Sequence, residues 1–240
     1  MVGAKLVMPG PKMGDGEALC ELLDSEDVSL ALGVPTVWLA LLQYCKAAGK
    51  RLDKLQRTVI GGAAVPRSMI QEFRDDHGVE ARQGWGMTEM SPLGVVNTLK
   101  AGLEGLSDEE QLDLAAKAGR GIYGCEMRIV DDEGAELPWD GEAYGALHVR
   151  GPWICSDYFK LDGAAGSHTD DGWFDTGDVA AADGTGAAAG VIALPVPTTV
   201  SDADLASLRM ESRGRVTAAV ARSASAAGCQ GIVCSPGEIN

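Results

Sequence analysis

Residues 83–89 combine side chains that suit the binding of a planar, phosphorylated ligand. In this run Trp85 stands between two glycines, and Thr88 and Glu89 follow at once. A large aromatic ring can stack on a base, a hydroxyl can contact a phosphate oxygen, and a carboxylate can hold Mg²⁺. We expect a loop here that leaves the end of a strand and binds such a ligand. A glycine-rich turn with an exposed Thr-Glu pair is the alternative.

A second candidate loop is the run Gly61-Gly62-Ala63-Ala64. Paired glycines allow the backbone to pass close to a flat ligand because no Cβ stands in the way. A tight strand-to-helix turn ahead of Pro66 is the other interpretation, and the glycine pair taken alone favours it.

Two later segments carry further candidate chemistry. Residues 171–178 read Asp-Gly-Trp-Phe-Asp-Thr-Gly-Asp, and residues 145–152 read Gly-Ala-Leu-His-Val-Arg-Gly-Pro, with Tyr158 and Phe159 following. The carboxylate of Asp178 has two acceptor oxygens, which suits a vicinal diol. Thr-Gly-Asp by itself would more often be a turn.

Together, these segments resemble signatures of the adenylate-forming superfamily, which includes acyl-CoA synthetases, adenylation domains of peptide synthetases and luciferases. Residues 84–89 resemble its G-Y/W-G-x-T-E signature, and residues 171–178 resemble its D-G-W-F-x-T-G-D segment. Residues 145–159 resemble its G-E-L-x-V-x-G…G-Y segment, although alanine replaces glutamate at Ala146. The run 1–179 is most similar to medium-chain and short-chain acyl-CoA synthetases.

The resemblance implies a two-step reaction. The carboxylate of a fatty or short-chain acid attacks the α-phosphate of ATP to give an acyl-adenylate and pyrophosphate, and the thiol of coenzyme A then displaces AMP. ATP/AMP, Mg²⁺ and coenzyme A are therefore the implied ligands. Sulfur-containing acids such as methylmercaptopropionate fall within the range of such enzymes.

The resemblance also assigns roles to residues. Trp85 would stack on adenine, Thr88 would bond the α-phosphate, Glu89 would help to hold Mg²⁺, and Asp178 would bind both ribose hydroxyls. Thr88 and Glu89 would be the catalytic residues and Glu89 the metal ligand. The implied nucleotide-binding residues are Gly61, Gly62, Ala63, Gln83, Gly84, Trp85, Gly86, Met87, Thr88 and Asp178.

Other elements of the superfamily have no counterpart in this sequence: the phosphate loop with its lysine, the arginine beside the ribose, and the carboxyl-terminal lysine. Since these groups supply charge to the transition state, we expect a truncated fragment without ligase activity. A non-catalytic protein that binds a nucleotide or an acyl ligand, and an adenylation domain that loads a carrier protein, are the alternatives.

The composition limits the possible partners and location. The 240 residues include 20 basic and 35 acidic side chains, for a net charge of −15, which disfavours nucleic acid. No uninterrupted apolar run is long enough to span a membrane, and the first residues do not read as a secretory signal. We expect a cytoplasmic protein without a membrane span. Its six cysteines include no C-x-x-C pair, which favours free thiols.

The elements that must position these residues follow from periodicity. Alternating helix and strand signals up to residue 83 predict an α/β fold with a parallel sheet. A capping box at Ser107 and Glu110 predicts a helix to about Ala118, and period-two patterns then predict an antiparallel β region. The expected elements are helices 17–27, 36–48 and 67–77, strands 28–32 (buried), 57–60 and 79–83, and antiparallel strands 126–130 and 144–150 around the turn 131–134.

Composition changes abruptly near Gly184. From there to Asn240 the chain has no aromatic residue and no lysine, and it is rich in alanine, glycine and serine. Such small side chains bury little apolar area to offset chain ordering. We therefore expect a partial AMP-binding domain over residues 1–183 and a weakly structured or foreign tail over residues 184–240.

Overall fold

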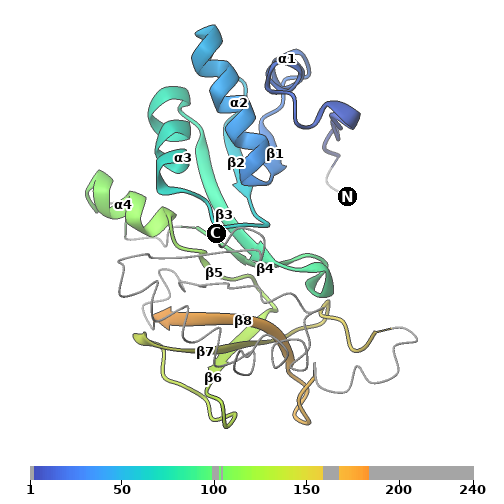
Figure 1. The fold of residues 1–240 in the computed structure, drawn as a ribbon, viewed down its shortest axis with the longest axis vertical. Coiled ribbons are helices and arrows are strands. Elements are labelled where there is room, and N and C mark those ends of the chain that lie inside the picture. Colours follow the sequence, from blue (N-terminus) through green and yellow to red (C-terminus); the bar gives the residue numbers. More distant parts are fainter. Residues whose placement is uncertain (1–2, 99–102, 104, 159–167, 184–240) are drawn as a thin grey trace, which may run out of the picture. The chain divides into compact units, whose positions relative to one another are not determined.

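A computed structural model describes residues 3–98, 103, 105–158 and 168–183 (Figure 1). The predicted tail, residues 184–240, and Phe159 lie outside these residues. The chain divides into two compact units, residues 1–83 and the residues from Gly84 onward. Strand β3 lies at the boundary, since its first four residues pair with β2 and its last three with β4.

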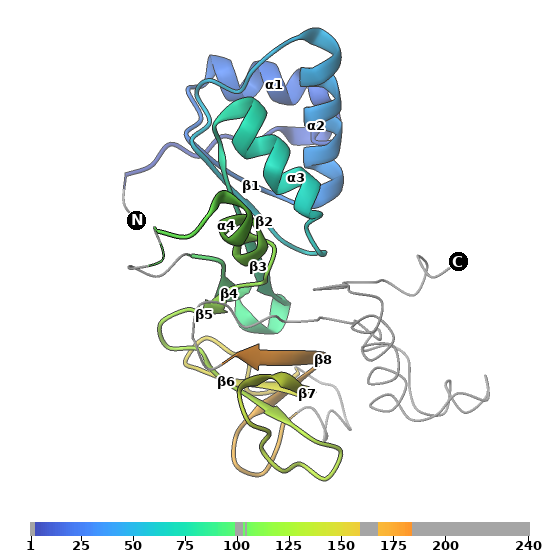
Figure 2. The ribbon, with the colours of Figure 1, turned by 90° about the vertical axis from the view of Figure 1, so that its left-hand side faces the viewer.

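The first unit is built from alternating helices and strands. The strands β1, β2 and β3 are parallel and adjacent in that order, which confirms the predicted parallel sheet. The crossover helices α2 and α3 lie on the same face of these strands (Figure 2). The elements are a 3₁₀ turn Gly10–Lys12, α1 Gly16–Ser25, β1 Leu30–Gly33, α2 Pro35–Ala48, β2 Arg57–Ile60, α3 Arg67–Glu72 with a π-helical turn Phe73–His77, and β3 Glu80–Gly86.

Local sequence signals set the ends of these helices. The Asp15 side chain accepts hydrogen bonds from the amides of Glu17 and Ala18 and so caps α1. Helix α2 begins at Pro35, whose missing N–H removes no helical hydrogen bond, and it ends at Gly49 with φ +64°. The bounds of α2 agree with the predicted helix 36–48 to within one residue, whereas α1 ends at Ser25, two residues before the end of the predicted helix 17–27.

Strand β1 differs from its prediction as a buried strand. Leu30 is 49% exposed and Leu32 is 73% exposed. Within the described residues β1 is the edge of its sheet, with β2 as its neighbour. The apolar run predicted the strand correctly, but an apolar pattern does not show whether a second layer covers both faces.

The second unit is mainly antiparallel. Strands β4 and β5 continue from the end of β3, while β6, β7 and β8 form a separate three-stranded sheet with β7 in the middle (Figure 1). The elements are a 3₁₀ turn Thr88–Met90, β4 Leu93–Val96, α4 Asp108–Ala115, β5 Arg120–Gly121, β6 Glu126–Val130, β7 Asp140–Arg150 and β8 Phe174–Asp183.

Two predictions for this unit can be compared with the structure directly. The capping box of Ser107 and Glu110 is present, although α4 ends at Ala115 rather than near Ala118. Strands β6 and β7 are antiparallel, as the period-two pattern indicated. The core joins the two sheets of this unit through Trp85, Met90, Val95, Ala118, Ile129, Leu147, Val149, Phe174, Ala180 and Ala182.

Candidate nucleotide site

Two of the predicted site residues are in direct contact. The indole Nε1–H of Trp85, near the end of β3, donates a hydrogen bond of 2.9 Å to Oδ2 of Asp178 on β8. Ninety-three residues separate the two in sequence. Trp85 is only 8% exposed and packs in the core of the second unit, whereas Asp178 is half-buried. Both candidate segments therefore meet at one place.

A local irregularity in β8 sets the position of Asp178. The register with β7 shifts between Ala146 and His148, which pair with Val179 and Asp175, so β8 bulges over residues 176–178. Gly177 has φ +72°, a conformation that favours glycine. Bulges commonly redirect a side chain beside a functional site, and this one directs Asp178 to the Trp85 indole.

Thr176 holds this bulge together. Its hydroxyl donates to the Leu147 carbonyl at 2.8 Å and accepts from the Asp178 amide at 3.1 Å. The Gly177 amide donates to Oδ1 of Asp175 at 2.9 Å. Thr176 is 3% exposed, so its hydroxyl is satisfied internally and the Thr-Gly-Asp run is part of a strand, not an isolated turn.

The environment of Asp178 disfavours its charge. Burial raises the pKa of this carboxyl to about 6, although the hydrogen bond from Trp85 acts in the opposite direction; the nearby Asp175 charge raises it further. A carboxylate can accept about four hydrogen bonds, and the Trp85 indole supplies one of them to Asp178. Hydroxyl donors from a ligand could bind at the other acceptor positions.

The segment 83–89 is not the single loop that the sequence suggested. Gln83 to Gly86 belong to β3, and Thr88 begins a 3₁₀ turn, with Met87 between them. A Cβ on Gly86 would lie 1.9 Å from the Pro92 carbonyl oxygen. That glycine therefore has a packing role against the following segment, which the sequence interpretation missed.

Thr88 and Glu89 lie on this turn immediately after the strand. Thr88 is exposed and Glu89 is half-buried. Oε1 of Glu89 accepts a 2.8 Å hydrogen bond from the Tyr158 hydroxyl, and its backbone carbonyl accepts from the Cys155 amide at 2.8 Å. Sequence reasoning noted Tyr158 only as part of a family-like segment and gave it no role.

The chemistry of the turn fits a Mg²⁺ ion bound mainly through a ligand. Among the residues that the structure describes, no group of three or more His, Cys, Asp or Glu side chains could hold a metal by itself. Mg²⁺ usually takes one or two protein carboxylates and completes its shell with phosphate oxygens and water. Glu89 could supply the protein carboxylate beside an exposed hydroxyl.

The predicted glycine loop belongs to the first unit. The Gly61 amide donates to the Gly33 carbonyl at 3.2 Å, and Gly62 is exposed with φ +80°. Ala63 is half-buried, and the buried Gln83 pairs with Ile60 in the parallel sheet. The loop therefore follows β2 directly, as the sequence indicated.

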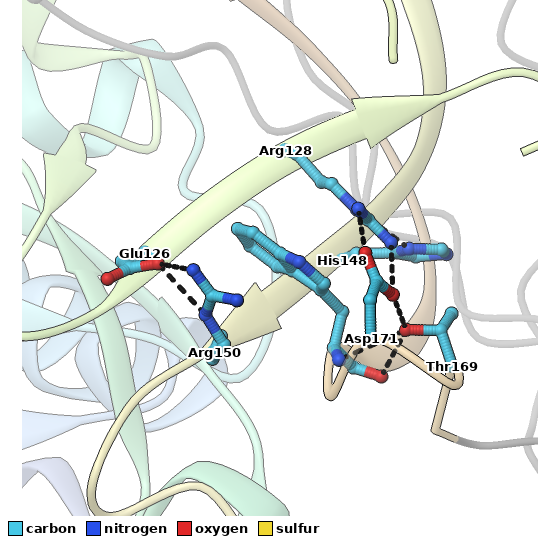
Figure 3. A network of polar contacts seen from close by, with 7 residues as sticks. Glu126, Arg128, His148, Arg150, Thr169 and Asp171 are labelled. Carbon is cyan, nitrogen blue, oxygen red and sulfur yellow. Dashed lines mark hydrogen bonds and ion pairs between the residues drawn. The ribbon is translucent and has the colours of Figure 1, made fainter. Parts of the chain in front are cut away.

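Other residues of the segment 171–178 stabilise the three-stranded sheet (Figure 3). The guanidinium groups of Arg128 and Arg150 lie over the ring of Trp173, at 4.6 and 4.5 Å from its centroid. Asp171 accepts two hydrogen bonds from Arg128, at 2.7 and 3.1 Å, and Glu126 forms an ion pair with Arg150. The Arg128 guanidinium lowers the pKa of Asp171 to about 2.

The chain combines a mixed parallel and antiparallel α/β fold with a hydrogen bond between Trp85 and Asp178 that joins two of the predicted segments. The family of AMP-binding enzymes matches residues 1–159, and the chain belongs to this family.

Curated relatives agree with this assignment. The chain is 52% identical over 186 residues to the medium-chain-fatty-acid–CoA ligase of Ectopseudomonas oleovorans, 50% identical over 186 residues to the 3-methylmercaptopropionyl-CoA ligase of Ruegeria pomeroyi, and 49% identical over 187 residues to the long-chain-fatty-acid–CoA ligase of Thermus thermophilus. Each match covers 78% of this chain and 34% of the relative. The chain thus spans about a third of the length of these relatives.

Solved structures share the fold. An anthranilate CoA ligase in complex with anthranoyl-AMP matches with a TM-score of 0.63 at 22% identity, over 77% of this chain and 33% of that one. The O-succinylbenzoate coenzyme A synthetase of Bacillus subtilis, in complex with ATP and magnesium, matches with a TM-score of 0.60 at 23% identity, over 74% and 34%. Both support the mixed α/β architecture.

Two further predictions concern thiols and membranes. The described cysteines, Cys20, Cys45, Cys125 and Cys155, are free thiols, as expected. Within the described part of the chain, no helix combines the length and the apolar character needed to cross a membrane.

Proposed function

We propose that this chain carries nucleotide-binding residues of a cytoplasmic ATP-dependent acyl-CoA synthetase. Such an enzyme joins a carboxylic acid to ATP, giving an acyl-adenylate and pyrophosphate, and then transfers the acyl group to the thiol of coenzyme A with release of AMP. Membership of the AMP-binding family and relatives named as fatty-acid and 3-methylmercaptopropionyl CoA ligases support this proposal.

The hydrogen bond between Trp85 and Asp178 carries the proposal. It occupies one carboxylate oxygen of Asp178 with a neutral donor and leaves acceptor capacity for the two hydroxyls of a ribose. The same bond fixes the indole plane. Stacking of adenine on the part of the indole that remains accessible stays a prediction, as does the contribution of Gly61, Gly62 and Ala63.

Thr88 and Glu89 would serve the phosphates. The exposed Thr88 hydroxyl can donate to an α-phosphate oxygen, and Glu89 can bind Mg²⁺, which would neutralise phosphate charge during the transfer. No histidine is needed as a general base, because the substrate carboxylate is already ionised. Gly84, in β3, and Met87, directly before the 3₁₀ turn, would complete this part of the proposed nucleotide site.

Calorimetric titration of the chain with AMP tests this proposal. We expect saturable binding by the wild type and at least a tenfold loss in Asp178→Asn, since an amide replaces one acceptor oxygen with a donor. Circular dichroism and thermal unfolding check that the variant is folded. Equal AMP affinity of the two proteins, or no heat with the wild type at millimolar AMP, would contradict the proposed site.

A further inference from the structure

Tyr158 makes a specific contact with the carboxylate assigned to Mg²⁺. Its hydroxyl donates to Oε1 of Glu89 at 2.8 Å, although 69 residues separate the two. Both side chains are half-buried. The contact is not isolated, because the Cys155 amide donates to the Glu89 carbonyl and the Ser91 hydroxyl donates to the Trp153 carbonyl at 3.1 Å. The segment after β7 is thus attached to the 88–91 turn at three points.

The chemistry of this contact suits the orientation of a metal ligand. A glutamate on a short turn has three side-chain torsions, and binding a cation requires that they be ordered. A donor on one oxygen fixes the plane of the carboxylate and leaves Oε2 to bind a cation. Outer hydrogen-bonding partners of this kind commonly determine how strongly a carboxylate binds its metal.

The Tyr158 hydroxyl is the donor in this contact, and the Glu89 carboxylate is the acceptor. A neutral phenol adds no positive charge that would compete with a cation, in contrast to a lysine or arginine partner. The interaction therefore orients the carboxylate without neutralising it.

We propose that Tyr158 is a positioning residue that orients the Glu89 carboxylate toward the Mg²⁺ of a bound Mg²⁺–ATP complex. This inference rests on the proposed function, since it requires ATP at the site and Glu89 as the metal ligand. It adds a residue from the 151–158 segment to the functional set. The attachment of that segment to the turn would then contribute to metal binding as well as to packing.

The test measures how ATP affinity depends on the Mg²⁺ concentration. Calorimetric titrations of the full chain with ATP at graded Mg²⁺, and with AMP without metal, compare the wild type with Tyr158→Phe, which loses a single hydroxyl. We expect the Mg²⁺ concentration for half-maximal enhancement of ATP binding to rise about tenfold in Tyr158→Phe, while AMP affinity stays within about twofold. Tyr123→Phe is the matched control, because Tyr123 is fully exposed, and it should behave as the wild type.

A second variant separates positioning from general disturbance of the fold. Glu89→Gln should lose at least as much Mg²⁺ dependence, and Tyr158→Phe added to it should cause no further loss of AMP or Mg²⁺–ATP affinity. A further loss in that background, or an equal loss for AMP and Mg²⁺–ATP in the single variant, would overturn the inference. So would unchanged Mg²⁺ dependence in Tyr158→Phe beside a clear effect of Glu89→Gln.

Two other outcomes concern the proposed function itself. If wild-type ATP binding responds to Mg²⁺ but Glu89→Gln leaves that response unchanged, Glu89 is not the metal ligand, and the role of Tyr158 fails with it. If the wild type binds neither AMP nor ATP, the nucleotide site is refuted as a whole. If Glu89→Gln changes the Mg²⁺ response and Tyr158→Phe behaves as the wild type, only the role of Tyr158 is refuted.

Discussion

The indole N–H of Trp85 donates its hydrogen bond to a carboxyl group, that of Asp178, whose charge the protein otherwise disfavours. One neutral donor does not offset the loss of water around a carboxylate. The pKa of Asp178 is therefore raised to about 6 instead of lowered. Carboxyl groups whose ionised form destabilises the folded protein are typical of ligand-binding sites.

Asp178→Asn should stabilise the protein at neutral pH. Because the folded-state pKa, about 6, exceeds the ordinary value of 3.8, the folded protein binds more protons between these values, and its stability falls as pH rises from about 4 to 6. The stability of Asp178→Asn should not fall in this way between pH 4 and pH 6, because an amide does not ionise. Urea unfolding should show a gain of up to about 3 kcal/mol at pH 7 that disappears near pH 4.

The exposed Asp132 supplies the control for this measurement. Asp132→Asn should leave the difference in unfolding free energy between pH 4 and pH 7 as it is in the wild type. An Asp178→Asn protein that is less stable than the wild type at pH 7 would contradict the burial argument.

AMP binding should depend on pH through the same group. Only the ionised Asp178 carboxylate can accept from both ribose hydroxyls, so affinity should be constant above about pH 6 and fall up to tenfold per pH unit below it. Near pH 6 binding should release protons, which calorimetry in buffers of different ionisation enthalpy detects. An affinity that is flat from pH 5 to pH 7.5 would be incompatible with this role.

Trp173→Leu should weaken the sheet that carries Asp178. The substitution removes the aromatic ring over which the Arg128 and Arg150 guanidinium groups lie, and both cation–π contacts are lost. We expect the free energy of unfolding to fall by about 1–3 kcal/mol. Trp139→Leu, at a tryptophan that is 38% exposed, should change it by less than about 1 kcal/mol. Similar losses in both variants would show that the stack contributes little.

Gly86→Ala should destabilise the protein by at least about 2 kcal/mol, because the new Cβ would overlap the backbone carbonyl of Pro92. Gly14→Ala is the control, since a Cβ there meets nothing within 4 Å, and its effect should be within about 0.5 kcal/mol. Denaturant unfolding measures both. Unchanged stability of the Gly86→Ala protein would contradict the packing role of Gly86. The absence of a side chain there would then serve only the close approach of a ligand.

The sequence was most informative where local signals set local structure. Helix α2 follows from Pro35, its apolar spacing and Gly49, and the cap of α4 follows from Ser107 and Glu110. The parallel order of β1 to β3 follows from the alternation of elements. These features depend on near neighbours in the chain, and periodicity and capping chemistry record them.

Features that depend on distant segments could not be predicted in the same way. The bulge at residues 176–178 and the contact between Tyr158 and Glu89 join segments that only the folded chain brings together. The exposure of Leu32 depends on what covers β1, not on its own residue type. The resemblance named Trp85 and Asp178 separately, but their hydrogen bond came only from the structure.

The most direct test of the central claim is the response of the Trp85 indole N–H to AMP in a ¹⁵N-correlated NMR spectrum. The chain has five tryptophans, and the spectrum of Trp85→Phe identifies the resonance of interest. We predict that saturating AMP shifts the Trp85 resonance more than those of Trp38, Trp139, Trp153 and Trp173, because the ribose and adenine bind at its hydrogen-bonded partner. AMP that binds while the Trp85 resonance stays in place would contradict the site described for this protein.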